Sequence, residues 1–205
     1  MADNYLIQAA QAKACFLRYD QDKLIEKLHL AADDQYLYTA MFSTPYRIHR
    51  KTGDIDRLEE ETWVDVGTHS EVMTLLDLVC DSKQERFLSG KLKNMADFGL
   101  MFHQSLLEER DPWAQRFQDN LEGFRRACTA LKGKPLPIGD AAYAIELFDG
   151  LCIVLQLWLG DEEFPPNLRF LWDENALMYI KYETMYYARG LLLQWLGAEM
   201  EAKNG

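Results

Sequence analysis

The chain has 205 residues, of which 48% are hydrophobic and 27% are charged, a composition typical of a soluble globular protein with a sizeable core. Its formal net charge of -11 at pH 7 repels phosphate backbones and anionic lipid surfaces, so nucleic-acid and membrane partners are disfavoured. This length predicts a single domain over residues 1–205.

The cysteines point to a reducing compartment. They are far apart and include no Cys-x-x-Cys pair: Cys15, Cys80, Cys128 and Cys152. Because zinc and iron–sulfur sites need closer spacing, no metal or cofactor is assigned, and we expect four reduced thiols. The N-terminus shows no signal-peptide pattern, and the longest apolar run, residues 151–159, is too short to cross a bilayer. The predicted location is therefore cytoplasmic.

Two helices and a polar hairpin are predicted at the start of the chain. Residues 4–19 carry apolar side chains at helical spacing, and Asp20 or Asp22 can cap a second, short helix. Strands are then predicted at residues 36–42, 46–50 and 54–58. Because the outward residues of this hairpin are charged, we expect it to be solvated.

The middle of the chain predicts two amphipathic helices. Thr68 and Glu71 form a capping-box pattern at the start of the first helix. Residues 82–103 lack a clear period and are expected to be irregular. The second helix begins at Asp111-Pro112 and is predicted to continue without a break until Gly133 ends it.

A buried hairpin follows. Residues 142–148 and 151–158 are two apolar runs separated by Asp149-Gly150, a pair that favours a two-residue type I′ turn. Both faces of the second run are mostly apolar, which predicts a central strand covered on both sides. Two prolines then interrupt the pattern, and residues 167–172 return as a strand.

The last helix, from about Tyr182 to Met200, is apolar around most of its circumference. Such a helix must be covered on several sides, and the N-terminal helix, a second subunit or a ligand could provide the cover. Helices and hairpins in segregated runs favour an α+β fold. We expect one antiparallel sheet, built from two hairpins plus the returning strand, packed against several helices.

One nine-residue run carries a family resemblance. The segment WLGDEEFPP, residues 158–166, resembles the domain-of-unknown-function family numbered 3786. Shorter segments are similar to that family too: Leu171-Trp172-Asp173, Gly139-Asp140, Tyr46-Arg47-Ile48 and Gly53-Asp54-Ile55. The resemblance covers most of the chain and implies one domain in a bacterial or archaeal protein. Some members of that family carry a cysteine-rich iron–sulfur segment, which this sequence lacks, and the resemblance implies no mechanism.

The acidic loop, residues 160–166, is the first candidate site. It contains three adjacent carboxylates, which Asp173 and Asp140 could join: Asp161, Glu162 and Glu163. Carboxylates bind hard cations, and two held in a desolvated place acquire separated pKa values. In the other interpretation Asp161 caps the turn, Phe164 fills the core and the glutamates face water, since no calcium-loop or two-metal pattern is present.

An aromatic pocket is the second candidate. Six rings from the last third of the chain could converge, although such rings usually belong to a core: Trp158, Trp172, Tyr179, Tyr182, Tyr186 and Trp195. Together the two candidates give the predicted ligand-binding residues: Asp161, Glu162, Glu163, Trp158, Asp173 and Tyr182. No catalytic residue and no metal ligand are assigned.

Three hypotheses about function stay open. The first is a cytoplasmic, non-catalytic binding module for a small ligand or a protein partner. The second is an enzyme of unassigned class, metal-assisted in one form, that uses a carboxylate of the acidic loop as ligand or base. The third is a structural protein that forms a homo-oligomer through its C-terminal helix. No phosphate-binding loop, serine-nucleophile motif or zinc-binding histidine pair assigns a reaction.

Overall fold

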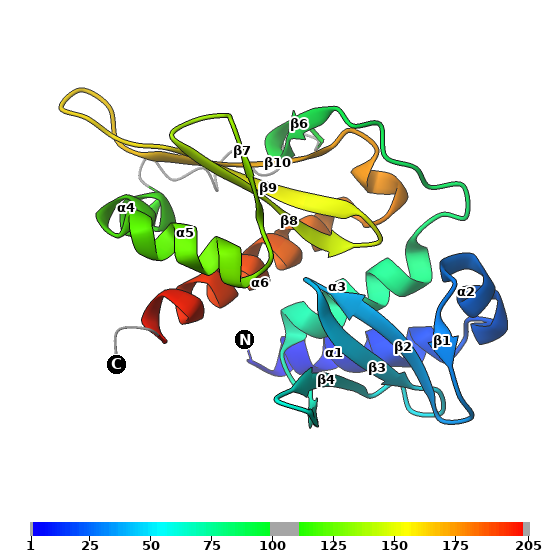
Figure 1. The fold of residues 1–205 in the computed structure, drawn as a ribbon. Helices are drawn as coiled ribbons and strands as arrows, with labels where there is room; N and C mark the ends of the chain where they lie inside the picture. The colour runs from blue at the N-terminus through cyan, green and yellow to red at the C-terminus, as the bar shows by residue number, and fades with distance from the viewer. Residues whose placement is uncertain (1, 99–110, 203–205) are drawn as a thin grey trace. The chain divides into compact units, whose positions relative to one another are not determined.

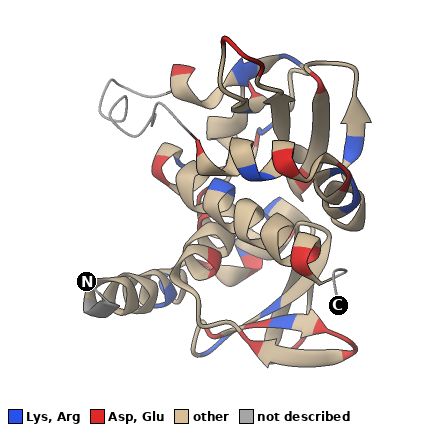
Figure 2. Cartoon of the chain, turned by 90° about the vertical axis from the view of Figure 1, so that its left-hand side faces the viewer, with Lys and Arg blue, Asp and Glu red and all other residues tan. Residues whose placement is uncertain are grey.

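The structure is a computed structural model that describes residues 2–98 and 111–202. The chain divides into two compact units (Figure 1). Unit 1 comprises residues 1–87 and 177–188, and unit 2 comprises residues 88–176 and 189–205. Acidic and basic residues occur on elements of both units (Figure 2). The single-domain expectation stays a prediction.

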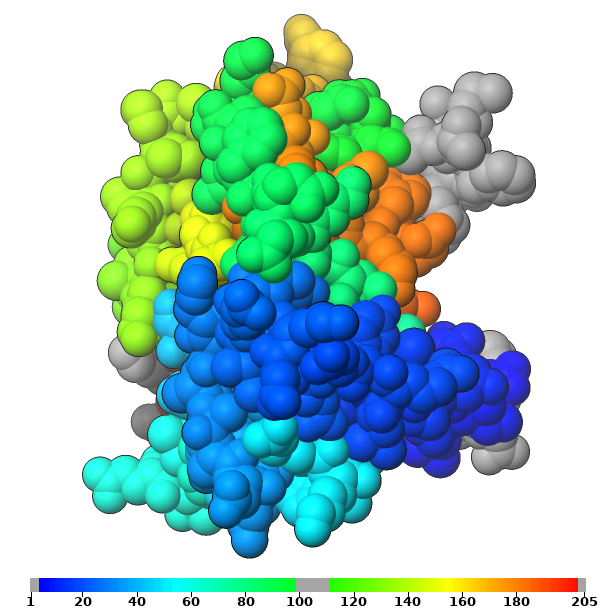
Figure 3. All heavy atoms as spheres, turned by 90° about the vertical axis from the view of Figure 1, so that its right-hand side faces the viewer, coloured from blue at the N-terminus to red at the C-terminus, as the bar shows by residue number. Residues whose placement is uncertain are grey.

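Unit 1 combines a five-stranded antiparallel sheet with three helices. The helices are α1 (Ala2–Phe16), α2 (Gln21–Leu28) and α3 (His69–Asp81). The strands follow one another in the order of the chain: β1 (Ala31–Ala32), β2 (Tyr36–Met41), β3 (Thr44–His49), β4 (Ile55–Glu59) and β5 (Thr62–Asp65). The predicted helices and the three predicted strands are confirmed. Figure 3 shows α1 and α2, in blue, at the molecular surface.

The sheet of unit 1 is not the solvated hairpin that its charged residues predict. One face is buried at alternating positions, with Leu37, Tyr46, Ile48 and Ile55 fully enclosed. Arg47 and Asp56 lie on the other face, where the guanidinium of Arg47 stacks on aromatic rings, whereas Arg57 shares the face of Tyr46 and donates to Glu71 of α3. The prediction was wrong because the period of two leaves an apolar face even in a polar sequence.

The predicted capping box at the start of α3 is also wrong. Thr68 is the N-cap, but its side chain makes no capping bond to the helix backbone. Its hydroxyl instead donates to Glu71 Oε2 over 2.9 Å, and Glu71 Oε1 accepts from Tyr46 and from Arg57. Glu71 is buried, so its carboxylate requires these donors, and they hold it toward the sheet.

Unit 2 contains a second five-stranded antiparallel sheet. Its strands lie in the order β6-β10-β9-β8-β7. They are β6 (Leu92–Asn94), β7 (Lys134–Leu136), β8 (Ala141–Phe148), β9 (Leu151–Trp158) and β10 (Asn167–Asp173), with helices α4 (Pro112–Asp119) and α5 (Leu121–Ala130) and short 3-10 helices η1 (Met95–Asp97) and η3 (Ala176–Met178). The α+β class is confirmed. The two predicted hairpins, however, belong to separate sheets.

The buried hairpin of unit 2 follows the sequence closely. Asp149 and Gly150 both have positive φ, at 49° and 81°, as a type I′ turn requires. Strand β9 is central in the sheet, and β10 pairs with it as the returning strand. The expected cover on both faces of β9 is incomplete, because Trp158 is exposed and Gln156 is half-buried on the second face.

The long helix predicted after Asp111 is two helices. Asn120 leaves the helical conformation, with φ -137° and ψ 63°, and ends α4. Its side chain then accepts a hydrogen bond from the backbone N–H of Gly123 over 2.9 Å and starts α5. The rings of Phe117 and Phe124 stack across this break, 4.6 Å apart, so the apolar spacing continues while the backbone does not.

The stretch predicted as irregular, residues 82–103, contains ordered elements. Strand β6 pairs with the end of β10, and η1 follows it. The prediction was wrong there because a three-residue edge strand carries too few positions to show a period. The remainder, residues 99–103, lies outside the described residues.

Helix α6 (Tyr182–Glu201) is apolar around most of its circumference because parts of it belong to both units. Residues up to 188 belong to unit 1 and those from 189 belong to unit 2, so the helix contributes to two cores. Its buried apolar residues are Met185, Ala188, Leu191, Leu192, Leu193, Leu196 and Met200. Self-association through α6 stays a prediction. Within residues 2–98 and 111–202, no helix is both long and apolar enough to cross a membrane.

Candidate functional site

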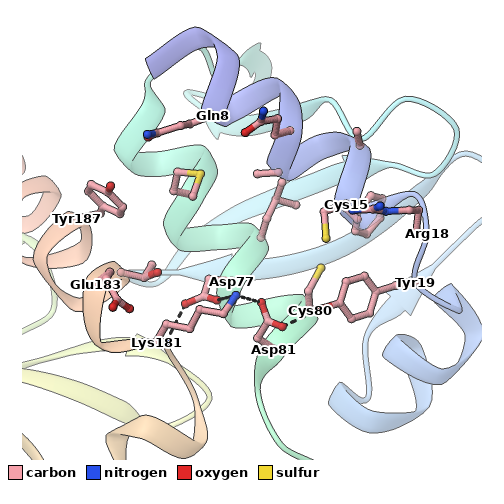
Figure 4. A pocket seen from close by; sticks show the side chains of 17 residues that line it. Gln8, Cys15, Arg18, Tyr19, Asp77, Cys80, Asp81, Lys181, Glu183 and Tyr187 are labelled. Atoms are coloured by element: carbon pink, nitrogen blue, oxygen red, sulfur yellow. Dashed lines mark hydrogen bonds and ion pairs between the residues drawn. The ribbon is translucent and has the colours of Figure 1, made fainter. Parts of the chain in front are cut away.

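A pocket of about 820 Å³ opens in unit 1 between α1, α3 and the first turns of α6 (Figure 4). Its apolar lining comes from α1 and α3 and includes Ala12 and Phe16 of α1 and Met73 and Leu76 of α3. Polar groups from all three elements complete it. Pockets that bind small molecules combine a volume of roughly 300–1,000 Å³ with mostly apolar walls and a few placed polar groups. This pocket has such a volume, and more than half of its lining residues are polar or charged.

Two aspartates and a lysine form a charged cluster in the pocket (Figure 4). Asp77 and Asp81 are four residues apart on α3 and therefore share one helix face. Lys181 Nζ lies 3.0 Å from Asp77 Oδ1 and 2.5 Å from Asp81 Oδ2. The hydroxyl of Tyr19 donates to Asp81 Oδ1 over 2.8 Å. The ammonium thus reduces the repulsion between the two carboxylates.

Asp77 also anchors the start of α6. The backbone N–H of Lys181, the residue just before the helix, donates to Asp77 Oδ2 over 2.8 Å. Lys181 in turn accepts, through its carbonyl, the first helical hydrogen bond from Met185. A carboxylate at a helix N-terminus offsets the partial positive charge there. The Asp77 side chain is therefore buried at a position where it joins α3 to α6.

The environment separates the pKa values of the two aspartates. Burial raises the pKa of Asp77. Burial also acts to raise the pKa of Asp81, but hydrogen bonds from Lys181 and Tyr19 and the contact with Asp77 lower it overall. The two carboxylates raise the pKa of Lys181 against the effect of its own burial. Two carboxyl groups whose pKa values are moved apart can act as a proton acceptor and a proton donor.

Two of the four free cysteines line the same pocket, Cys15 from α1 and Cys80 from α3. Burial, reinforced by the charge of Asp81, raises the pKa of the Cys80 thiol to about 12. Since the thiolate is the nucleophile, Cys80 is an unreactive thiol at neutral pH. Its role in the pocket is that of a small apolar group.

The acidic loop of unit 2 is held in its turn by hydrogen bonds among its own residues. Asp161 Oδ1 accepts hydrogen bonds from the backbone N–H groups of Glu163 and Phe164, at 2.9 and 2.8 Å, and these bonds lower the Asp161 pKa. Glu162 and Glu163 are exposed. Asp140 caps the other side by accepting from the N–H of Leu159. Phe164 is 68% exposed, so the interpretation that it fills the core is wrong.

Asp173 accepts hydrogen bonds from residues of unit 2 outside the acidic loop. Its carboxylate accepts from the backbone N–H groups of Ser89, Gly90 and Asn175 at 3.1, 2.7 and 2.9 Å, and from the Ser89 hydroxyl. Burial acts to raise its pKa, but these donors lower it overall. Among the described residues, none of its hydrogen bonds or ion pairs involves residues 161–163.

The six aromatic residues divide between the units. Trp158 is 44% exposed on unit 2, whereas Trp172 is fully buried. The Tyr182 hydroxyl lies 2.8 Å from the Tyr186 hydroxyl in unit 1. Ligand binding by Tyr182, Trp158 and the acidic residues stays a prediction.

The sequence contained one signal for the charged cluster. Asp77 and Asp81 interrupt the apolar positions of a predicted helix at a spacing of four, where a buried face is expected. Lys181 carries no such signal, since it meets them across about a hundred residues of chain. Within the part of the chain that the structure describes, no three His, Cys, Asp or Glu side chains are placed to hold a metal ion.

Comparison with known proteins identifies a family. The model of the family described as "Domain of unknown function (DUF3786)" matches residues 20–195, well over half of the chain. The searches of curated proteins and of solved structures gave no match. The resemblance carried by the WLGDEEFPP run is confirmed, and the chain belongs to the DUF3786 family.

Proposed function

We propose that this protein is a cytoplasmic, non-catalytic binding module whose small-molecule ligand occupies the pocket of unit 1. The observation that carries the proposal is the pocket itself, about 820 Å³ in volume and lined by apolar residues beside the Asp77–Lys181–Asp81 cluster. In the cluster, the Lys181 ammonium lies between both carboxylates, the Lys181 backbone N–H donates to Asp77 and the Tyr19 hydroxyl donates to Asp81, so the polar wall is held in place before a ligand binds. Pre-organised polar groups lower the entropic cost of binding.

The test is a screen of a metabolite library by thermal unfolding of the full chain. A ligand at a hundred times its dissociation constant adds about 2.7 kcal/mol, which for a protein of this size raises the midpoint by roughly 5–11 °C. The variant Ala12→Trp places an indole in the pocket and should lose the shift. Ala40→Trp, at an exposed position of β2, is the matched control and should keep it. Equal shifts in all three proteins would contradict the proposal.

A second candidate function is an enzyme that uses the paired carboxylates. Its support is that the pKa of Asp77 is raised and that of Asp81 is lowered beside an open pocket. Such a pair is suited to proton transfer to or from a bound substrate. Once a ligand is known, Asp77→Asn separates the two functions. A binding module should leave the ligand unconverted in the wild type and in Asp77→Asn alike, whereas an enzyme should convert the ligand in the wild type and fail to convert it in Asp77→Asn.

A further inference from the structure

One side of helix α1 is apolar and exposed. Its residues recur at spacings of three and four, which places them on one side of a helix: Leu6, Ile7, Ala10, Ala14 and Leu17. Leu17 directly follows α1 and continues its hydrogen bonding, because its N–H donates to the carbonyl of Lys13 over 3.2 Å. Leu6, Ile7 and Leu17 are 65%, 53% and 40% exposed, and both alanines are exposed. We call these five residues the outer stripe of α1.

The opposite side of α1 packs on unit 1. Phe16 is fully buried there, and the helix contacts α3. Figure 3 shows α1, in blue, at the surface of the molecule. Single exposed apolar residues are common on soluble proteins, but a continuous stripe of them along a helix indicates an interaction surface.

The charge of this surface restricts its partner. Residues 4–12 carry no charge, and Lys13 is paired with Asp54 over 2.9 Å. Helices that lie on membranes carry Lys and Arg beside their apolar side, and residues 4–12 lack them. A protein of complementary charge would likewise find nothing to pair with here. Two copies of this chain, each with a net charge of -11, repel each other where acidic surfaces meet, so an uncharged stripe is where they can approach.

The order of residues along the outer stripe fits its own copy when two helices run antiparallel. Large side chains lie at both ends and small ones between them. In an antiparallel pair related by a two-fold axis, Leu6 and Ile7 of one copy face Leu17 of the other, and Ala10 faces Ala14. The alanines near the centre let the helix axes approach to about 8–10 Å, a separation at which the larger side chains interdigitate.

We infer that two copies of this chain form a dimer through the outer stripe of α1, with the two helices antiparallel. One pair of helices buries less area than a standard interface of roughly 1,600 Å², so we expect a weak dimer with a dissociation constant of about 1–100 µM. The inference does not depend on the proposed function, because Ala14 is the one residue of the stripe that also lines the pocket.

The first experiment measures the mass of the full chain by sedimentation equilibrium between about 1 and 500 µM. We expect a monomer–dimer equilibrium that added NaCl strengthens, because salt screens the repulsion between two acidic copies. Hydrogen exchange of the wild type at both ends of this range is a second readout that needs no variant. Exchange of residues 4–17 should slow at the higher concentration.

Charge variants test the antiparallel pairing. Leu6→Lys and Leu17→Glu should each weaken the dimer by at least about tenfold, because each homodimer would bury two unpaired charges. The double variant should dimerise about as well as the wild type, because antiparallel helices place each lysine opposite a glutamate of the other copy. Leu177→Lys, at a leucine that is 43% exposed outside α1, is the matched control and should dimerise like the wild type. Circular dichroism checks that each variant folds.

The outcomes decide both the dimer and its arrangement. A monomer at about 500 µM overturns the inference and leaves the stripe to a different protein. A dimer that both single variants leave unchanged also overturns it, since another surface, such as α6, would then hold the copies together. If the double variant fails to recover the dimer that the single variants lose, the antiparallel arrangement is wrong. The ligand shift that depends on Ala12 is measured separately, so the binding-module proposal can fail or survive independently.

Discussion

Asp77 in unit 1 and Asp173 in unit 2 expose similarly small fractions of their surface, 6% and 7%. The surroundings nevertheless move their pKa values in opposite directions. Asp173 accepts three backbone hydrogen bonds and a hydroxyl bond. Asp77 accepts one backbone hydrogen bond from Lys181 and shares the Lys181 ammonium with Asp81.

The difference shows that a small exposed surface does not by itself decide the charge of a carboxyl group. Burial acts to raise the pKa of both aspartates. At Asp173 enough donors converge to overcome it, which fixes the carboxylate as a structural anion. At Asp77 burial has the largest effect, and a second carboxylate competes for the one cation, so the pKa is raised. In unit 2 the buried Asp173 therefore binds backbone N–H groups. In unit 1 the buried Asp77 lines a pocket and has a raised pKa.

The largest effect is expected from Asp173→Ala. It leaves the backbone N–H groups of Ser89, Gly90 and Asn175 without their acceptor, so unfolding free energy should fall by about 3 kcal/mol. Urea unfolding measures the loss, and hydrogen exchange should rise in residues 89–90. Asp173→Asn, which keeps one acceptor oxygen, should lose less. An equal loss in both variants would show that the hydrogen bonds are not the cause.

A smaller loss is expected from Lys181→Met, which leaves Asp77 and Asp81 without their shared cation. Because the Lys181 side chain is 59% exposed, water replaces part of the interaction, and the loss should be about 1–2 kcal/mol. Adding Asp77→Asn removes one of the two repelling charges and should restore part of the stability. A double-mutant cycle in urea tests this coupling. Additive losses would mean that the three groups do not act as a cluster.

The pH dependence should have opposite signs at the two aspartates. Asp173 has a lowered pKa, so its contribution is present above its unfolded value of about 3.9 and is lost as the pH falls through its folded pKa. Asp77 has a raised pKa, so its contribution is present below about 3.9 and is lost as the pH rises through its folded pKa.

The measurement compares the unfolding free energy of the wild type with that of Asp77→Asn and Asp173→Asn from pH 3 to 7. The advantage over Asp77→Asn should shrink as the pH rises above about 4, and the advantage over Asp173→Asn should grow as the pH rises toward about 4. The pKa of Asp81 is lowered, so Asp81 titrates below the pH range in which the Asp77 difference shrinks. If both differences in unfolding free energy changed with pH in the same direction, the opposite pKa shifts of Asp77 and Asp173 would be refuted.

The smallest effect is expected in the acidic loop. Phe164→Ser removes a ring that is 68% exposed, so stability should change by less than about 0.5 kcal/mol in thermal unfolding. Gly160→Ala is the contrasting variant, because an added Cβ would lie 2.6 Å from the backbone nitrogen of Pro166 and must displace it. Equal effects would mean that the loop is not held in the conformation described.

Local chemistry made several elements predictable. Asp149-Gly150 specifies a turn through the positive φ that both residues accept, and Asp20 caps the short helix α2 by accepting from the N–H of Lys23. The conformation at Asn120 was missed because its side chain competes with the helix backbone while the apolar spacing continues. These features depend on residues within a few positions of one another.

The sequence by itself therefore determined the α+β class, the central hairpin and the family. The tertiary structure decided that there are two sheets, that Glu71 serves the sheet rather than a helix cap, and that Lys181 meets Asp77. The physical reason is the separation along the sequence between the residues that interact. Turns and caps are set by backbone angles and nearby donors, whereas a buried charge is satisfied by whichever donors the folded chain brings to it, and their distance along the sequence carries no signal.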